Sequence, residues 1–80
     1  MIYVYALKSK SRNYIYVGLT KDLKRRIIEH NAGKNKTTRA YRPFELLYDE
    51  IYSNRVEARK REKFLKSGVG KEFLRNLQKQ

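Results

Sequence analysis

One carboxylate lies where an amphipathic helix should be apolar. Ala58, Glu62 and Leu65 are spaced at i, i+4 and i+7, so they share one face of a helix. The two apolar residues should pack against a sheet, and a carboxylate between them is unfavourable unless something uses its charge. Glu62 is therefore a candidate functional group. The alternative is a structural Glu at the edge of the stripe, paired with Arg59 or Arg61.

A guanidinium and an imidazole share a second helical spacing. Arg26 and His30 are i and i+4, and they flank Leu23 and Ile27, which we expect to face inward. Both polar side chains would then lie at the edge of the buried stripe and point along the sheet surface. The planar Arg26 group matches phosphate oxygens and stays charged, and His30 could relay a proton or bind a phosphate. The alternative is that both are ordinary solvated residues.

Tyrosines replace aliphatic residues in both halves of an expected hairpin. Tyr3 and Tyr5 lie on one face of the first strand, and Tyr14 and Tyr16 on one face of the second. A small core would normally take Val, Ile or Leu at such sites, because a buried phenol needs a partner for its hydroxyl. The pattern fits a phenol-lined active site, with edge packing or base stacking as the alternative.

The hairpin that carries these tyrosines is predicted from composition. The segments 2–7 and 14–18 are rich in β-branched and aromatic residues, and the polar segment 8–13 separates them. A third strand is predicted over 44–52, where Phe44, Leu46 and Tyr48 alternate with Glu45, Leu47 and Asp49, and Pro43 fits its start.

Three helices are predicted around these strands. The first covers about 21–31, with Thr20 as its N-cap and Gly33 as its stop. The second follows Asn54, whose spacing to Glu57 suits a capping box, and runs to about Lys66. A third covers 71–77, with Phe73, Leu74 and Leu77 inward. The order β-β-α-β-α-α predicts one α+β domain over residues 1–80, a small three-stranded antiparallel or mixed sheet flanked by helices.

Composition limits the function classes. The 80 residues include 20 Lys and Arg against 8 Asp and Glu, so the formal charge is +12, which indicates a polyanionic partner. The absence of Cys excludes disulfides, zinc knuckles and thiol catalysis, and a single His excludes a multi-His metal site. No stretch approaches about 20 apolar residues, so we expect no membrane-spanning helix. The start of the chain lacks the features of a signal peptide, so we expect a cytoplasmic protein.

The basic charge leaves nucleic acid, an anionic membrane or an acidic protein as partner. A membrane-surface ligand would prefer one long amphipathic helix with a basic face. Here the basic residues are spread over the hairpin turn, the central loop and the helices. Nucleic acid is therefore the expected partner, with no membrane and no small-molecule cofactor, for a monomer or weak homodimer.

Taken together, these positions resemble the GIY-YIG nuclease superfamily. Tyr3-Val4-Tyr5 and Tyr16-Val17-Gly18 are similar to its two-part signature, and Arg26 and His30 follow at the spacing of its catalytic Arg and His. Glu62 is similar to its metal-binding Glu. The segment 37–46 resembles the threonine–arginine loop and strand of the small single-domain branch.

The resemblance implies an endonuclease that hydrolyses DNA phosphodiester bonds with Mg²⁺ or Mn²⁺. The implied catalytic residues are Tyr5, Tyr16, Arg26, His30 and Glu62, and Glu62 would bind the metal. Tyr5 is the candidate general base, or both tyrosines only position water. The implied nucleic-acid-binding residues are Lys34, Lys36, Thr38, Arg39, Tyr41 and Arg42, with Tyr41 stacking on a base or covering the sheet edge. The alternative function is a non-catalytic nucleic-acid-binding module derived from a nuclease domain.

Overall fold

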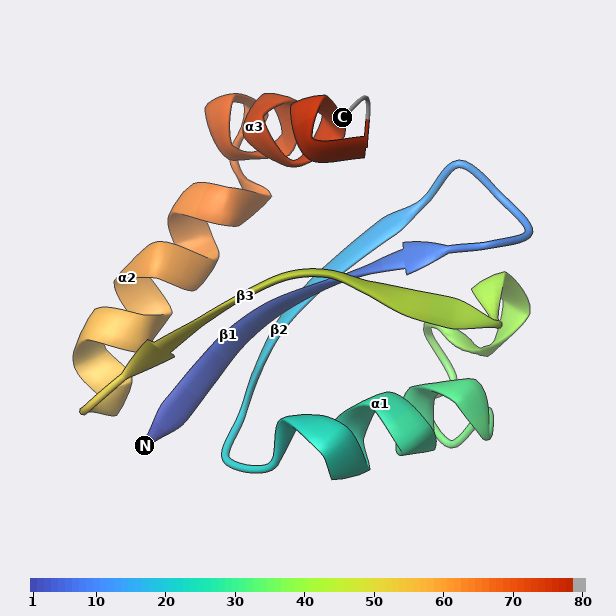
Figure 1. The fold of residues 1–80 in the computed structure, drawn as a ribbon, viewed down its shortest axis with the longest axis horizontal. Helices are drawn as coiled ribbons and strands as arrows, with labels where there is room; N and C mark the ends of the chain where they lie inside the picture. The colour runs from blue at the N-terminus through green and yellow to red at the C-terminus, as the bar shows by residue number, and fades with distance from the viewer. Residues whose placement is uncertain (79–80) are drawn as a thin grey trace.

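A three-stranded sheet forms the centre of the computed structural model, which describes residues 1–78 (Figure 1). Its strands are β1 (Ile2–Ser9), β2 (Ile15–Thr20) and β3 (Phe44–Tyr52), in the order β2-β1-β3 and antiparallel throughout. The predicted hairpin is confirmed: β1 ends two residues later than predicted, and β2 begins one residue later and ends two residues later. Because β1 lies between the other two strands, its residues are the best placed for burial.

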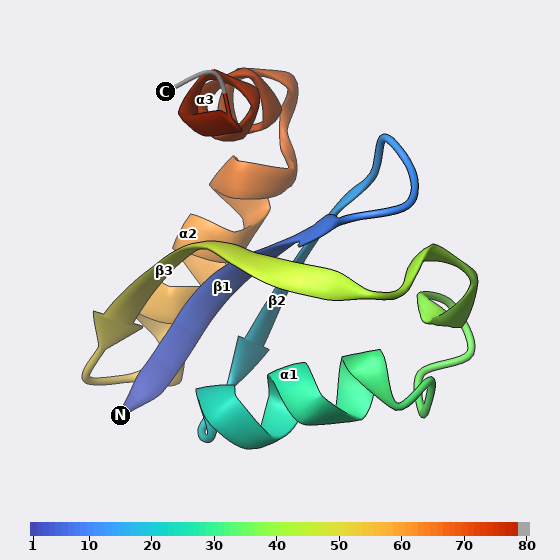
Figure 2. The same ribbon diagram turned by 45° about the vertical axis from the view of Figure 1, so that its right-hand side comes forward.

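Helices cover both faces of the sheet (Figures 1 and 2). α1 (Leu23–Asn31) packs on one face, and α2 (Arg55–Lys66) and α3 (Gly68–Gln78) pack on the other. A short 3-10 turn at Arg39–Tyr41 precedes β3. The predicted α+β class and element order are confirmed. Within residues 1–78, no helix has both the length and the apolar character needed to cross a bilayer.

The side chains on the two faces of β1 contribute to two different hydrophobic cores. Val4 and Ala6 point toward α2 and α3 and belong to a core of aliphatic residues from the sheet and both helices. Tyr5 and Leu7 point toward α1 and pack with Phe44 and with partly buried aromatic and aliphatic residues. The tyrosines predicted to share a face therefore lie on the α1 side. Ile28 of α1 is 60% exposed and lies outside this core.

A bulge in β3 changes the predicted alternation. Ala6 pairs with Tyr48 and Leu7 pairs with Leu46, so Leu47 is the extra residue on the bulged strand. Phe44 consequently faces α1, whereas Leu47 and Tyr48 both pack against the α2–α3 core and Leu46 is exposed. The prediction of uninterrupted alternation along β3 is wrong, because the extra residue shifts the phase of every side chain beyond it.

The helix ends follow local hydrogen bonds, with two differences from the predictions. α1 begins later than predicted, because the Asp22 side chain, not that of Thr20, caps it by accepting from the Arg25 N–H at 3.1 Å. Asn54 caps α2 as predicted, accepting from the Glu57 N–H at 2.9 Å. α3 begins earlier than predicted, at Gly68.

Candidate active site

Tyr5 lies on the central strand of the sheet, and a glycine on the neighbouring strand leaves space for its side chain. Its side chain is fully buried on the α1 face, opposite Gly18 of β2. A Cβ on Gly18 would lie 2.7 Å from the Tyr5 hydroxyl oxygen and 2.9 Å from Cε2 of Tyr16. Real Cβ atoms do not approach other atoms so closely, so Gly18 is the residue that lets both phenol rings reach the same place.

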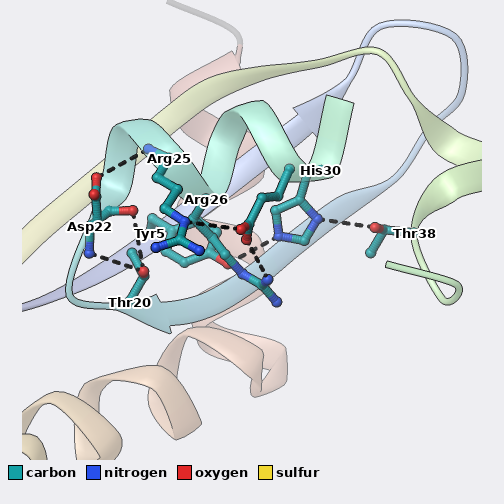
Figure 3. Close-up of polar contacts among 8 residues, drawn as sticks. Tyr5, Thr20, Asp22, Arg25, Arg26, His30 and Thr38 are labelled. Atoms are coloured by element: carbon teal, nitrogen blue, oxygen red, sulfur yellow. Dashed lines mark hydrogen bonds and ion pairs between the residues drawn. The ribbon is translucent and has the colours of Figure 1, made fainter. Parts of the chain in front are cut away.

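His30 completes a buried hydrogen-bonded chain with Tyr5 (Figure 3). The imidazole is fully buried, with Nε2 at 3.1 Å from the Tyr5 hydroxyl and Nδ1 at 3.0 Å from the Thr38 hydroxyl. The ring of Tyr16 packs against it, with 4.8 Å between ring centroids. The predicted convergence of Tyr5, Tyr16 and His30 is therefore present, and Thr38 joins them.

The end of α1 is fixed by the residue after His30. The Asn31 side chain accepts from the Phe44 N–H at 2.6 Å and donates to the Phe44 carbonyl at 3.2 Å. This paired contact attaches α1 to the first residue of β3. It holds His30 over the sheet, and the helical pattern alone carried no signal for it.

Burial controls the protonation of both groups. It raises the pKa of Tyr5 to about 12, although the Arg26 guanidinium opposes the effect. A free tyrosinate at this position would cost roughly 7 kcal/mol at pH 7, compared with about 4 kcal/mol for an exposed phenol. Burial also lowers the pKa of His30, and the charge of Arg26 lowers it further. At neutral pH the pair is thus a neutral phenol bonded to a neutral imidazole.

Arg26 lies one helical turn before His30 and keeps its charge. Its side chain is about one-third exposed, and its Nη1 atom is 3.1 Å from Glu29 Oε1. Contact with the Tyr5 hydroxyl raises the pKa of Arg26, and the bond to Glu29 acts in the same direction. Glu29 also pairs with Arg25 at 3.2 Å and so anchors both guanidiniums. Its i, i+3 and i, i+4 spacing was visible in the sequence, but nothing there distinguished it from other surface pairs.

Glu62 approaches the tyrosines from the opposite layer. It lies on α2, is only 9% exposed, and forms ion pairs with Arg59 at 3.7 Å and Lys66 at 3.2 Å. Arg61, the other partner considered for it, instead binds Glu50 of β3 at 3.0 Å. The charge of Glu62 raises the pKa of Tyr5, which places the carboxylate within electrostatic reach of that hydroxyl.

The central loop carries the residues that were predicted to contact nucleic acid, and one of them, Thr38, is placed differently from that prediction. Its four cations are exposed: Lys34, Lys36, Arg39 and Arg42. Thr38 is fully buried and its hydroxyl bonds His30, so its position does not fit direct contact with a nucleic acid. The ring of Tyr41 stacks on Tyr14 with 3.9 Å between centroids, and the Arg12 guanidinium carbon lies 5.4 Å from the ring centroid. Its packing at the end of the hairpin matches the structural alternative considered for it.

Glu62 fits a divalent metal only if the substrate supplies further ligands. Among residues 1–78, no three His, Cys, Asp or Glu side chains gather where they could hold a metal ion. Mg²⁺ prefers carboxylate oxygens, and it often takes one or two of them together with waters and substrate phosphates. A nearly buried carboxylate whose charge acts on the Tyr5 hydroxyl fits that mode. A metal bound by protein ligands alone does not fit this donor set.

These observations define an α+β domain with a polar site assembled around two strands of its sheet, the helix that follows them and a later helix. Residues 1–76 match the GIY-YIG catalytic domain family. The chain therefore belongs to the GIY-YIG family, whose members are typically nucleases.

More specific similarities are to bacterial proteins named UPF0213, a name that states no activity. One from Staphylococcus epidermidis is 39% identical over 77 residues, covering 95% of this chain and 93% of its own. Another from Clostridium perfringens is 43% identical over 67 residues, covering 82% and 71% of the two chains. The solution NMR structure of a UPF0213 protein from Bacillus halodurans has a TM-score of 0.56 and 38% identity, covering 96% of this chain and 85% of that one.

Proposed function

We propose that the protein is a divalent-metal-dependent endonuclease that hydrolyses DNA phosphodiester bonds. The observation that carries the proposal is the buried chain from Thr38 through His30 to the Tyr5 hydroxyl, with Arg26 and Glu62 acting on that same hydroxyl. Buried titratable groups whose pKa values are shifted by burial and by a specific charged neighbour are typical of functional sites, and Tyr5 and His30 beside Arg26 fit that description. Family membership supports a nucleic-acid substrate.

In this proposal Tyr5 and His30 manage the proton of the attacking water. As the water oxygen bonds to phosphorus, its proton passes to the Tyr5 oxygen, and the Tyr5 proton passes to His30 Nε2. The P–O bond to the leaving group breaks, and that oxygen takes a proton from solvent. Because the transfer to His30 is concerted, no free tyrosinate forms, which matters for a phenol with a pKa of about 12.

Arg26 and Glu62 help to stabilise the negative charge of the reacting phosphate. The Arg26 guanidinium binds non-bridging phosphate oxygens and stabilises the negative charge of the transition state. Glu62 would hold Mg²⁺ or Mn²⁺, which would supply Lewis-acid stabilisation of the phosphate when bound. Tyr16 packs on His30 and supports the position of its ring.

Cleavage assays with matched variants test this proposal. The panel contains single-stranded, nicked, branched and duplex DNA with Mg²⁺ or Mn²⁺. We expect Arg26→Ala to lose about 10²- to 10³-fold in rate, as is typical when one such electrostatic group is removed. Arg25→Ala is the control, because Arg25 binds the same Glu29 but is largely exposed. Glu62→Ala should abolish metal-dependent cleavage, whereas Glu57→Ala on the exposed face of α2 should not.

A binding module without catalysis is the second candidate. The observation that favours it is that Arg59 and Lys66 already neutralise Glu62, so its burial is explained without a metal. Binding of DNA that shows no coupling to Mn²⁺, with no cleavage of any substrate in the panel, would establish this candidate and refute the endonuclease.

A further inference from the structure

A groove separates the edge of the sheet from the last two helices. It has a volume of about 470 Å³, which is within the range of about 300–1,000 Å³ typical of ligand pockets. One wall is β2, the outer strand of the sheet, and the other is formed by the end of α2 and by α3. Figure 1 shows α3 beside the end of the β1–β2 hairpin, on the side of the sheet away from α1. None of the predicted nucleic-acid contacts lies here.

The two walls of the groove differ in chemistry. The helical wall presents three exposed cations, Lys66, Lys71 and Arg75, and among residues 1–78 no acidic side chain lines the groove. The strand wall is the start of β2, an edge strand, with the residues just before it, and it includes Tyr14 and Tyr16. Their rings pack on the α1 side, against Tyr41 and His30, and both residues are only half-buried. A row of cations beside half-buried tyrosines at a sheet edge is a combination suited to unpaired nucleotides, since cations follow the phosphates and aromatic rings stack on bases.

A close contact between the two helices fixes the cationic wall. Gly70 of α3 lies so near the end of α2 that a Cβ there would be 2.1 Å from the Phe64 carbonyl oxygen and 2.4 Å from Leu65 Cα. The Ser67 hydroxyl also accepts from the Gly70 N–H at 3.3 Å. This corner places Lys71 and Arg75 of α3 along the same groove as Lys66 of α2. The wall is therefore built by the fold and does not depend on flexible loops.

The groove meets the candidate active site at two residues. Tyr16 lines the groove and also packs on His30. Lys66 lines the groove and also forms the 3.2 Å ion pair with Glu62. A strand whose phosphate reached Arg26 and Glu62 would thus enter the groove as it continues past β2.

We infer that this groove binds an unpaired nucleic-acid strand on one side of the scissile phosphate, with its phosphates on Lys66, Lys71 and Arg75 and a base against the tyrosines of β2. The placement relative to the scissile phosphate rests on the proposed nuclease function. The binding itself does not, because it depends only on the two walls. The substrate class that follows is single-stranded nucleic acid, or an unpaired end or flap of a duplex.

A pair of charge-matched double variants tests the groove. Lys71→Gln/Arg75→Gln removes two cations and the Arg75–Glu72 ion pair from the groove. Arg55→Gln/Lys60→Gln removes two cations and the Lys60–Glu57 ion pair from exposed positions of α2 outside the groove. Both proteins therefore have the same net charge, and neither change touches the proposed catalytic residues.

Binding is measured by fluorescence anisotropy with labelled oligothymidylate and with a duplex of equal length, in EDTA so that no cleavage occurs. Each phosphate contact contributes about 0.7 to the slope of log K against log salt on single strands, so the groove variant should lose about 1.4 from this slope. Its deficit relative to the control should shrink about 7-fold between roughly 50 and 200 mM salt. Amide shifts in NMR titrations should concentrate on β2 and α3.

The outcomes separate this inference from the nuclease proposal. Weaker single-strand binding by the groove variant alone, without DNA cleavage by the parent protein, would support the groove and refute the nuclease. Equal binding by the two variants, tighter binding of the duplex through the groove, or amide shifts confined to the central loop would overturn the inference. Folding of both variants is checked by the dispersion of their NMR spectra.

Discussion

Thr38→Val tests the buried hydrogen bonds that join Thr38, His30 and Tyr5. The substitution keeps the shape of the side chain and replaces the hydroxyl that lies 3.0 Å from His30 Nδ1 with a methyl group. In the proposed mechanism Nε2 must accept from Tyr5, so the ring proton must be on Nδ1 and must donate to Thr38. The hydroxyl therefore selects the tautomer, as hydrogen bonds to the second ring nitrogen generally do.

The expected magnitude follows from complete burial. Both residues are 0% exposed, so the variant leaves a buried nitrogen with no partner, which costs about 1–3 kcal/mol. The free energy of unfolding in urea should fall by that amount. If the same energy is lost from the reactive tautomer, cleavage should slow by about 5- to 150-fold, at 1.36 kcal/mol per factor of ten. KM for DNA should not change, because Thr38 does not reach the surface.

Two further variants complete this test. Thr38→Ser restores the hydroxyl and should restore both stability and rate, while Thr37→Val makes the same change at the exposed neighbouring residue and should be neutral. The ¹⁵N shifts of His30 report the tautomer directly. A Thr38→Val protein with unchanged stability, and with the Nδ1 proton still in place, would refute this account of the site.

The remaining predictions concern Gly18 and the Tyr5 hydroxyl. Gly18→Ala should lower the free energy of unfolding by about 1–3 kcal/mol, since its Cβ would lie 2.7 Å from Tyr5 Oη, whereas Gly68→Ala has no atom within 4 Å to meet and should not destabilise; equal urea midpoints for the two variants would contradict this. Because the pKa of Tyr5 is raised from 10.0 to about 12, the unfolded chain releases its proton first and stability should fall as pH rises from 10.0 to about 12. At 1.36 kcal/mol per pH unit the loss is about 3 kcal/mol, and Tyr5→Phe should lack this part of it; identical alkaline profiles for the two proteins would show that the hydroxyl is not buried.

The cores and elements could be read largely from local patterns. Periodicity and composition predicted three strands and three helices, because burial of one face requires apolar residues at fixed intervals along the chain. The third strand was predicted with its exact bounds, Phe44–Tyr52. Its bulge at Leu47 was not, because the extra residue is defined only by pairing with β1. The cap of α1 at Asp22 depends on which of two nearby polar side chains reaches the free N–H groups.

The sequence by itself determined which residues could do chemistry. The types and spacing of Tyr5, Tyr16, Arg26, His30 and Glu62 were sufficient to indicate the GIY-YIG family, because each element carries its residues at set positions along the chain. Sequence also established the excess of positive charge, which is a property of composition.

Only the tertiary structure decided how these residues are supported. Thr38 was predicted to bind nucleic acid and instead bonds His30, because the loop folds back over the end of α1. Gly18 leaves space for the Tyr5 side chain on the neighbouring strand. Lys71 and Arg75 line a groove whose other wall is β2. Each of these relations joins residues from separate segments, and packing creates such neighbours while local pattern does not encode them.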